Sequence, residues 1–579
     1  MSNLYTDEKN VLIIIALLKA NKIRKIVASP GATNVTFIAS VQHDPFFEVY
    51  SSVDERSAAY MACGLAHESG ETVVLSCTGA TSSQNYTPGL IEAYYRKLPI
   101  LAVTSTQQVA KVGHLIAQVT DRSNLPNDTQ RISLTLPIIK DDDDWWECEV
   151  KVNQAILELK RAGGGPVHIN LPTRYSRSYE TKTPPNCRVM DRFTATDTLP
   201  VLNGRVAVFV GAHRSFSSEE TEALDRFCSS NNAVVFCDHT SSYKGKYRLL
   251  YSLAASQDQM DLASVRPDIT IHTGEVTGDY AGMGMVGKEV WRVNEDGEIR
   301  DTFRKLRYVF EMEEITFFER YTDSSKAPSD QYLKHCQSRL KKVQQSIPQI
   351  PFSNIWVAQQ TAHKIPEGSA IHFAILNSLR SWNFFELPQS VNSMSNVGGF
   401  GIDGGLSSLI GASLANPHKL YFGIIGDLAF FYDMNALGNR HVGKNLRIMI
   451  INNGKGTEFR QYNHVAAHFG ELADEFISAS GHYANKSPTL MKHYAQDLGL
   501  KYISASTKEE YFAVCDEFLS KDIGQQSIVL EVFTNSEDES VALERIRNVK
   551  KDSKKSAKEA AKRILGKRSI NVIKKFIRD

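Results

Sequence analysis

Two short polar segments late in the chain contain the residue types that bind a cation. Gly426-Asp427-Leu428 closes the apolar run Leu420–Asp427, and Asn452-Asn453 closes the apolar run Leu446–Asn453. Two parallel strands joined by a crossover helix end side by side at one sheet edge, so Asp427 and Asn453 can share a cation. Carboxylate and amide oxygens suit Mg²⁺ or Ca²⁺, and a metal with open positions binds phosphate oxygens.

The turn Gly454-Lys455-Gly456 follows the asparagines directly. Its glycines let the chain approach a diphosphate closely, and Lys455 can add a backbone carbonyl to the ligands. Either half of the pattern alone indicates ordinary structure, because Asp427 can cap a helix and the asparagines can start a turn. Their combination on two apolar strands predicts a site for a cation-bridged diphosphate.

A second segment, SSVDERSAAYMACGLA at residues 51–66, places Glu55 at the start of a helix with small residues along one side. The helix dipole favours a carboxylate there, which by itself would explain Glu55. A buried carboxylate has a raised pKa and can exchange a proton with a bound ring. We therefore expect Glu55 to be buried if it is an acid–base group.

Gly426-Asp427 followed by Asn452-Asn453 resembles the diphosphate-binding motif of thiamine-diphosphate enzymes. The longer runs GDLAFFYDMNAL (426–437) and GIDGGLSSLIGAS (401–413) resemble the menaquinone-pathway SEPHCHC synthase, which adds a decarboxylated 2-oxoglutarate unit to isochorismate, within the acetolactate synthase branch. The resemblance implies Mg²⁺ bound by Asp427, Asn453 and the carbonyl of Lys455, with Gly426, Leu428 and Gly456 around the diphosphate. The family's Asp-to-Asn spacing is one residue longer, so the asparagine ligand can shift by one position.

The same resemblance assigns further cofactor contacts. Glu55 matches the glutamate that hydrogen-bonds the aminopyrimidine ring and promotes its imino tautomer, which removes the C2 proton of the thiazolium. Ile402, next to Gly401, matches an apolar wedge that bends thiamine diphosphate, and Asn85 matches a loop that approaches the cofactor from the first domain. In the family the cofactor lies between the first domain of one subunit and the third domain of its partner. This implies a homodimer or a homotetramer.

The substrate loop departs from the menaquinone-pathway pattern. That synthase binds carboxylate-rich substrates with arginines, which pair bidentately with carboxylates. Its S-P-G-S-R loop is Ser-Pro-Gly-Ala-Thr-Asn at residues 29–34 here, and a second family arginine falls at Val397. We expect a 2-oxo acid donor and a less acidic carbonyl or enone acceptor. The residues expected to contact substrate are Thr33, Asn34, Gln118 and Arg380.

Apolar runs alternate with helical patterns along most of the chain, which predicts an α/β fold with doubly wound parallel sheets. Strands are expected at 25–29, 72–76, 100–104, 205–211, 233–238, 268–274, 420–427, 446–453 and 527–533, with helices at 218–229 and 331–345. We predict a pyrimidine-binding domain at 1–183, a middle domain at 200–340 and a diphosphate- and metal-binding domain at 350–545, then a basic tail at 546–579. The polar stretch 181–199 is typical of a linker.

Composition limits the partners. The 579 residues carry a formal net charge of +1, so the whole chain has no general attraction to nucleic acid. The scattered cysteines and the lack of a signal or membrane span predict a cytoplasmic protein. From Lys550 onward, 12 Lys and Arg face 3 Asp and Glu, with isoleucines at helical spacing. This tail predicts peripheral contact with an anionic membrane surface or an acidic partner, or else a solvated tail.

A thiamine-diphosphate-dependent decarboxylase or carboligase is the function that these residues favour. A simple decarboxylase that releases an aldehyde and a non-catalytic scaffold with the same fold are the alternatives. A flavin or nicotinamide oxidoreductase is disfavoured, because the G-x-G-x-x-G at 399–404 follows a stretch that does not resemble an apolar strand. Three loop histidines, His114, His464 and His468, are further acid–base candidates.

Overall fold

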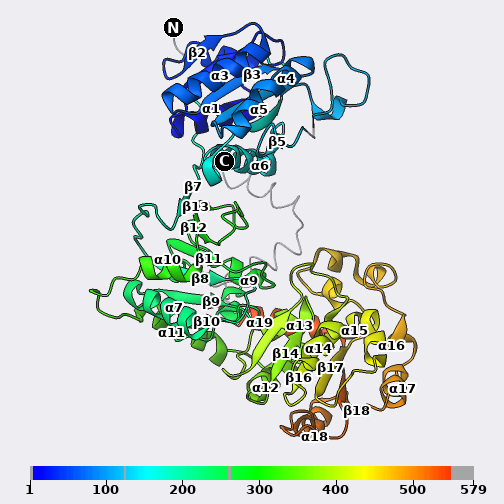
Figure 1. Cartoon of the computed structure of the whole chain (residues 1–579). Helices are drawn as coiled ribbons and strands as arrows, with labels where there is room; N and C mark the ends of the chain where they lie inside the picture. Colours follow the sequence, from blue (N-terminus) through cyan, green and yellow to red (C-terminus); the bar gives the residue numbers. More distant parts are fainter. Residues whose placement is uncertain (1–3, 123–124, 259–261, 550–579) are drawn as a thin grey trace, which may run out of the picture. The chain divides into compact units, whose positions relative to one another are not determined.

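The computed structural model describes residues 4–122, 125–258 and 262–549 (Figure 1). The described residues form two compact units: unit 1 contains those within 1–198 and 296–311, and unit 2 contains the other described residues. The predicted α/β class with parallel sheets is confirmed. The basic tail lies outside the described residues from Lys550 onward. No described helix combines the length and apolarity that a membrane crossing needs.

Unit 1 contains a parallel sheet in the order β2-β1-β3-β4-β6-β5. Side chains of β3 alternate between its two faces: Val74 joins the core under α1, α2 and α6, whereas Val73 and Leu75 join the core under α3 and α5. Both faces are therefore covered, which explains why the strands are apolar almost throughout. The elements are α1 (Lys9–Ala20), β1 (Lys25–Ala28), α2 (Val35–Val41), β2 (Glu48–Ser51), α3 (Glu55–Ser69), β3 (Val73–Thr78), α4 (Thr81–Asn85), α5 (Thr87–Tyr95), β4 (Ile100–Thr106), η1 (Val109–Lys111), β5 (Ser133–Thr135), α6 (Asp142–Glu158), η2 (Arg161–Gly163) and β6 (Val167–Pro172).

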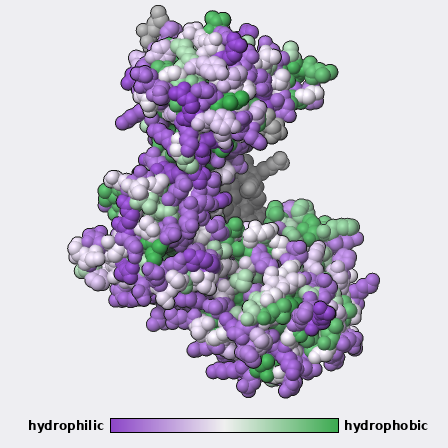
Figure 2. All heavy atoms as spheres, viewed as in Figure 1, coloured by the Kyte–Doolittle hydropathy of each residue, from purple (hydrophilic) through white to green (hydrophobic). Residues whose placement is uncertain are grey.

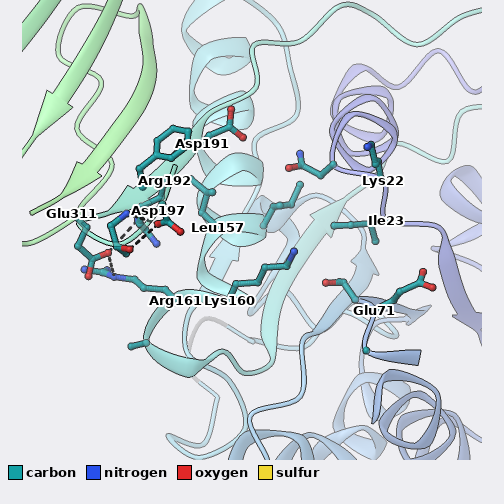
Figure 3. Close-up of a pocket in the computed structure, with 17 residues that line it drawn as sticks. Lys22, Ile23, Glu71, Leu157, Lys160, Arg161, Asp191, Arg192, Asp197 and Glu311 are labelled. Carbon is teal, nitrogen blue, oxygen red and sulfur yellow. Dashed lines mark hydrogen bonds and ion pairs between the residues drawn. The ribbon is translucent and has the colours of Figure 1, made fainter. Parts of the chain in front are cut away.

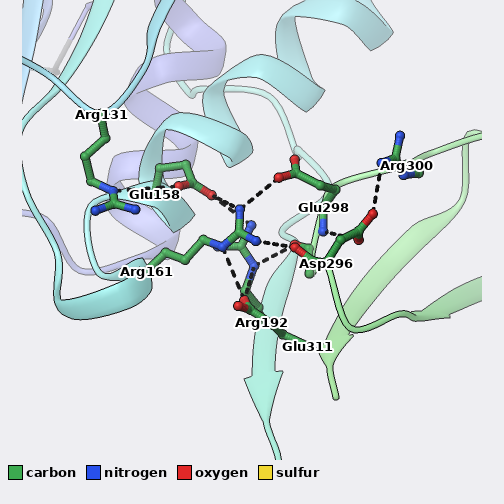
Figure 4. A network of polar contacts seen from close by, with 9 residues as sticks. Arg131, Glu158, Arg161, Arg192, Asp296, Glu298, Arg300 and Glu311 are labelled. Atoms are coloured by element: carbon green, nitrogen blue, oxygen red, sulfur yellow. Dashed lines mark hydrogen bonds and ion pairs between the residues drawn. The ribbon is translucent and has the colours of Figure 1, made fainter. Parts of the chain in front are cut away.

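Unit 1 also contains a strand where a linker was expected. Strand β7 (Asp191–Thr194) pairs in parallel with β13 (Leu306–Glu311). The buried carboxylate of Glu158 pairs with Arg161 and Arg192, and Arg161 also contacts Glu298 and Glu311 (Figure 4). The linker prediction for 181–199 is therefore wrong at β7. This ion-pair network also holds residues 296–311 in unit 1, and the composition of these segments does not reveal it.

Unit 2 begins with a parallel sheet in which the strands follow the order β10-β9-β8-β11-β12. The expected strands at 205–211, 233–238 and 268–274 are present, and the helix expected at 331–345 is α11. A complete capping box between Ser217 and Glu220 starts α7. The elements are β8 (Val206–Val210), α7 (Ser218–Asn231), β9 (Val234–Cys237), β10 (Arg248–Leu250), α8 (Ser252–Ala255), β11 (Ile269–Thr273), α9 (Tyr280–Met283), β12 (Glu289–Val293), α10 (Glu314–Arg320) and α11 (Gln331–Gln345).

The last sheet of unit 2 has the order β15-β14-β16-β17-β19-β18. Its edge strand β15 precedes the glycine loop at 399–404, where no strand was expected. In the described sheet β15 lies at the edge and pairs with β14 on one side. An edge strand does not need the apolar sequence of a central strand, which explains why β15 is polar. The elements are α12 (Asn354–Thr361), η3 (Ala362–Lys364), β14 (Ala370–Phe373), α13 (Asn377–Trp382), β15 (Asn392–Ser395), α14 (Gly405–Leu414), β16 (Tyr421–Gly426), α15 (Asp427–Asp433), η4 (Met434–Gly438), β17 (Leu446–Asn452), η5 (Thr457–Arg460), η6 (Val465–Ala473), α16 (Tyr483–Lys486), α17 (Leu490–Asp497), β18 (Lys501–Ala505), α18 (Lys508–Phe518), β19 (Ile528–Phe533) and α19 (Ser536–Arg547).

Candidate functional site

The two polar segments of unit 2 meet at one edge of the last sheet. Strands β16 and β17 are parallel neighbours in which Gly426 pairs with Ile451, so both strands end at the same level. Asp427 then begins α15, and Asn453 follows β17. Both residues line a cavity of about 170 Å³, which we call the Asp427 cavity. Its other lining residues include Ile402, Gly426, Leu428, Lys455, Gly456 and Glu458.

Asp427 is nearly buried, with 6% of its surface exposed. Burial raises the pKa of this carboxyl to about 7, although backbone hydrogen bonds from Leu428 and Gly454 oppose the rise. The Gly454 amide donates to Oδ2 at 2.8 Å, and Gly454 has a φ of +75°, which favours glycine. The turn therefore brings a backbone amide to the carboxylate and leaves the cavity side open.

The two asparagines have different environments. Asn452 donates from Nδ2 to Glu531 Oε1 at 2.6 Å, and its Oδ1 accepts from the Gly454 amide at 3.2 Å. Asn453 Oδ1 is buried without a hydrogen-bond partner among the described residues. A buried oxygen without a partner, on a residue that lines the same cavity as a desolvated carboxylate, fits a cation, whereas the side chain of Asn452 is already engaged. The geometry favours Asn453 over Asn452 as a ligand.

The side chain of Lys455 is engaged in an ion pair and is not a candidate metal ligand. Its Nζ forms an ion pair with Asp474 Oδ2 at 2.8 Å, and Arg460 pairs with the same carboxylate at 2.6 Å. Only the backbone of Lys455 is left to serve as a ligand. The Gly456 amide donates to the Ser478 carbonyl at 2.6 Å, which fixes the turn. At Gly401 a Cβ atom would displace the exposed carboxylate of Asp403, which lies close to the backbone before the half-buried Ile402.

In unit 1, Glu55 is the first residue of α3. The Asp54 side chain caps this helix by accepting from the Arg56 amide. Asn85 Nδ2 donates to Glu55 Oε2 at 3.3 Å, so the two predicted residues are brought together. Glu55 is only half-buried and Asn85 is exposed in the single chain. The expected burial of Glu55 is therefore not achieved by unit 1 alone.

Small residues set the position of α3 against the helix that follows Asn85. A Cβ at Gly89 on α5 would collide with Ala59 of α3, so the two helices pack at the closest distance that a glycine allows. Cys63 Sγ also donates to the Gly89 carbonyl at 3.2 Å. The alanine-rich pattern after Glu55 thus serves helix packing and fixes the direction from which Glu55 projects.

The substrate residues expected in unit 1 differ in accessibility. Thr33 and Asn34 are 1% and 2% exposed; Thr33 Oγ1 donates to the Ser105 carbonyl and Asn34 Nδ2 to the Ser29 carbonyl. Thr33 therefore anchors the loop to β4 and Asn34 closes the loop on itself, so a substrate contact would require the loop to rearrange. Gln118 is exposed and has a φ of +63°.

Arg122 is a buried cation that the sequence does not single out. It is 3% exposed, and its guanidinium lies against Gly79, just before α4. Its Nη1 donates to Thr104 Oγ1 at 2.6 Å and its Nη2 to Asn170 Oδ1, so its acceptors are neutral oxygens. Burial lowers the pKa of Arg122 to about 10. It occupies a polar loop without periodicity, so no sequence pattern reveals it.

Arg380 lies in unit 2, on α13. Its Nη1 forms an ion pair with Glu458 Oε1 at 2.5 Å. Glu458 lines the Asp427 cavity, and the sequence reasoning missed it because only the fold brings α13 and η5 together. His464 Nδ1 accepts from the Ala466 amide and starts η6, whereas His114 and His468 are exposed.

A larger cavity, of about 940 Å³, lies within unit 1 (Figure 3). None of the predicted site residues lines it. Its Arg161 and Arg192 are paired with Glu311, while Lys160 and Glu71 extend from opposite sides. The charged side chains of this cavity largely pair with one another and leave little net charge for a ligand. We therefore do not assign the active site to this cavity, although it is the larger one.

Comparisons with known proteins agree with this geometry. Residues 11–125 match the family model described as the N-terminal thiamine pyrophosphate-binding domain of thiamine pyrophosphate enzymes. A 2-succinyl-5-enolpyruvyl-6-hydroxy-3-cyclohexene-1-carboxylate synthase of Phocaeicola vulgatus is 30% identical over 563 residues, 93% of this chain and 98% of that protein. Synthases of the same name from Bacteroides fragilis and Porphyromonas gingivalis are 28% and 25% identical, over 92% of this chain in each case and 97% and 96% of those proteins. The chain therefore belongs to the family of 2-succinyl-5-enolpyruvyl-6-hydroxy-3-cyclohexene-1-carboxylate synthases and is a thiamine-diphosphate-dependent enzyme.

Proposed function

We propose that this enzyme uses thiamine diphosphate with Mg²⁺ to decarboxylate a 2-oxo acid and transfer the activated carbon unit to a carbonyl or enone acceptor. The observation that carries the proposal is the Asp427 cavity. There the desolvated carboxylate of Asp427 and Asn453, whose Oδ1 has no partner among the described residues, line one cavity at the ends of neighbouring strands. A divalent cation satisfies both oxygens and leaves positions for phosphate.

Each residue has a defined role in this proposal. Asp427, Asn453 and the Lys455 carbonyl would hold Mg²⁺, and Ile402 would exclude water from the cavity wall. When bound, thiamine diphosphate supplies the carbon nucleophile and the electron sink that decarboxylation requires. Glu55 would hold and release a proton at Oε1, since its Oε2 accepts from Asn85.

We also propose that the active enzyme is a homodimer or a homotetramer. The Asp427 cavity is smaller than the ~300 Å³ of typical ligand sites, and Glu55 is half-exposed, so neither half is complete alone. Large apolar side chains are exposed on segments that follow or flank both sets of site residues in the chain, and Figure 2 shows apolar patches on the surface of both units. These side chains include Val53, Tyr60 and Met61 in unit 1, and Val465, Phe469, Leu472 and Phe476 in unit 2.

Cofactor stripping tests the proposal. The chain is treated with a chelator, dialysed, and supplied again with thiamine diphosphate and Mg²⁺ together or separately. We expect carbon dioxide release from pyruvate, 2-oxoglutarate or a related 2-oxo acid only when both are present, in a sample that sediments as a dimer or larger. Release that is indifferent to stripping would contradict the proposal, as would no release from any acid. Mass analysis of the products separates ligation from aldehyde release.

A further inference from the structure

A second cavity of unit 2, of about 420 Å³, adjoins the Asp427 cavity. The two cavities share Asn377 and Glu458 in their linings. We call this second cavity the Arg380 cavity, after the arginine of its wall. Its volume is within the range of small-molecule sites. A molecule in it lies against the same glutamate that faces the proposed cofactor site.

Both arginines of the Arg380 cavity are already neutralised. Arg380 Nη1 contacts Glu458 Oε1 at 2.5 Å, and its guanidinium lies over the Tyr280 ring, 5.0 Å from the centroid. Arg547 Nη2 contacts Asp258 Oδ1 at 2.7 Å, and its Nε donates to the Ser256 carbonyl. A carboxylate-rich ligand would have to compete with these internal carboxylates and approach their charge.

The rest of the wall suits a neutral, hydroxylated ligand. Asn463 and Ser381 line it with an amide and a hydroxyl, which supply both donors and acceptors. Asn377 and Gln461 also line it, but their side-chain amides hydrogen-bond each other at 2.8 Å, so only their remaining polar atoms can face a ligand. Tyr280 and Phe384 add flat apolar surfaces. The buried Asp279 is not free for a ligand, because it caps α9 and accepts from Ser252 Oγ at 2.6 Å.

We propose that the Arg380 cavity is the acceptor subsite, that it takes a neutral hydroxylated carbonyl compound, and that Glu458 sets this preference by neutralising Arg380. The inference rests on the proposed function and specifies its acceptor. Glu458 acts as a specificity-determining residue, since its carboxylate masks the one guanidinium that both faces this cavity and contacts the wall of the Asp427 cavity.

The test uses two acceptors of equal size, neutral glycolaldehyde and anionic glyoxylate, with a donor acid that gives carbon dioxide release in the full-length enzyme loaded with thiamine diphosphate and Mg²⁺. Because glyoxylate is itself a 2-oxo acid, only ligation products that keep its carboxylate are counted. We expect the unmodified enzyme to favour glycolaldehyde. Glu458→Gln should shift the ratio of kcat/KM values toward glyoxylate about tenfold or more, through KM, because it unmasks Arg380. Arg380→Gln combined with Glu458→Gln should cancel the shift. Glu509→Gln, an exposed carboxylate on α18, is the charge-matched control.

Titration with succinate, an inert dianion, gives a second readout without turnover. We expect at least tenfold tighter succinate binding to Glu458→Gln than to the unmodified enzyme, and no such gain in the double variant. A preference of the unmodified enzyme for glyoxylate, or unchanged ratios and succinate affinities in Glu458→Gln, would overturn the inference. Either result leaves the cofactor-dependent release of carbon dioxide intact. Loss of that release in the unmodified enzyme would instead overturn the proposed function.

Discussion

The Asp427 cavity and the surroundings of Glu55 each offer one acidic group to the proposed cofactor. The two acidic groups differ in burial and in the number of their polar contacts. Asp427 is 6% exposed, accepts from a backbone amide at 2.8 Å, and shares its cavity with Asn453, whose buried Oδ1 has no partner in the part of the chain that the structure describes. Glu55 is half-buried and has one 3.3 Å hydrogen bond from an exposed asparagine. The proposed diphosphate half is therefore preformed within unit 2, whereas unit 1 alone leaves Glu55, the other half of the proposed site, partly open.

Removing the preformed half should have the largest effect. In Asp427→Ala the cavity loses its charged oxygen, so we expect cofactor retention to fall at least 100-fold and turnover to disappear. Binding of thiamine diphosphate, measured by calorimetry with Mg²⁺ present, checks this expectation. Asp497→Asn, an exposed acid at the end of α17, should bind normally. Undiminished cofactor affinity in Asp427→Ala would show that the cavity is not the diphosphate site.

Removing the charge of Glu55 should separate turnover from binding. Glu55→Gln keeps the size of the side chain but cannot release a proton, so we expect carbon dioxide release to fall by about 10²–10⁴-fold. Cofactor affinity should change little, because the diphosphate half stays intact. Full turnover in Glu55→Gln would refute the acid–base role. A parallel loss of binding would show that Glu55 mainly supports the structure.

The sequence predicted the preformed half better than the open one, for a physical reason. Asp427 and Asn453 follow apolar parallel strands, and local spacing determines that such strand ends meet. Contacts between segments distant in the chain have no local signature, so the Arg380–Glu458 pair and buried Arg122 were missed. Thr33 and Asn34 were expected to face substrate, yet both hydrogen-bond to their own unit. Strand β7 was missed because ion pairs, rather than an apolar pattern, accompany it.

The position of Glu55 depends on close packing of α3 against α5, and a stability measurement can probe this packing. Gly89→Val adds a branched side chain where even a Cβ collides with Ala59. We expect the free energy of unfolding to fall by about 3 kcal/mol, because α3 and α5 must separate. Denaturant melts check the value, and Gly64→Val on α3 is the matched control, because a Cβ atom there meets nothing within 4 Å. Equal losses in both variants would show that placing a β-branched side chain in a helix, rather than packing of α5 against α3, determines the effect.

The buried half should also respond to pH, through Glu539 on α19. This carboxyl lines the Asp427 cavity, accepts from the Asn354 amide and Thr534 Oγ1, and has its pKa raised by burial to about 7. Its ordinary value is 4.5, so between pH 4.5 and 7 the folded state binds more protons than the unfolded state. Stability from this group is therefore greatest at the acidic end of that window and is lost as the pH rises toward 7.

Glu539→Gln should remove that dependence without charging the cavity. In the cofactor-free chain, the free energy of unfolding should fall between pH 5 and pH 7. We expect this fall to be smaller in the variant than in the unmodified chain, by on the order of 1 kcal/mol. Glu537→Gln, an exposed acid on the same helix, should leave the profile unchanged. Identical profiles for Glu539→Gln and the unmodified chain would mean that water reaches this carboxyl. The Asp427 cavity would then be less closed than the contrast with Glu55 requires.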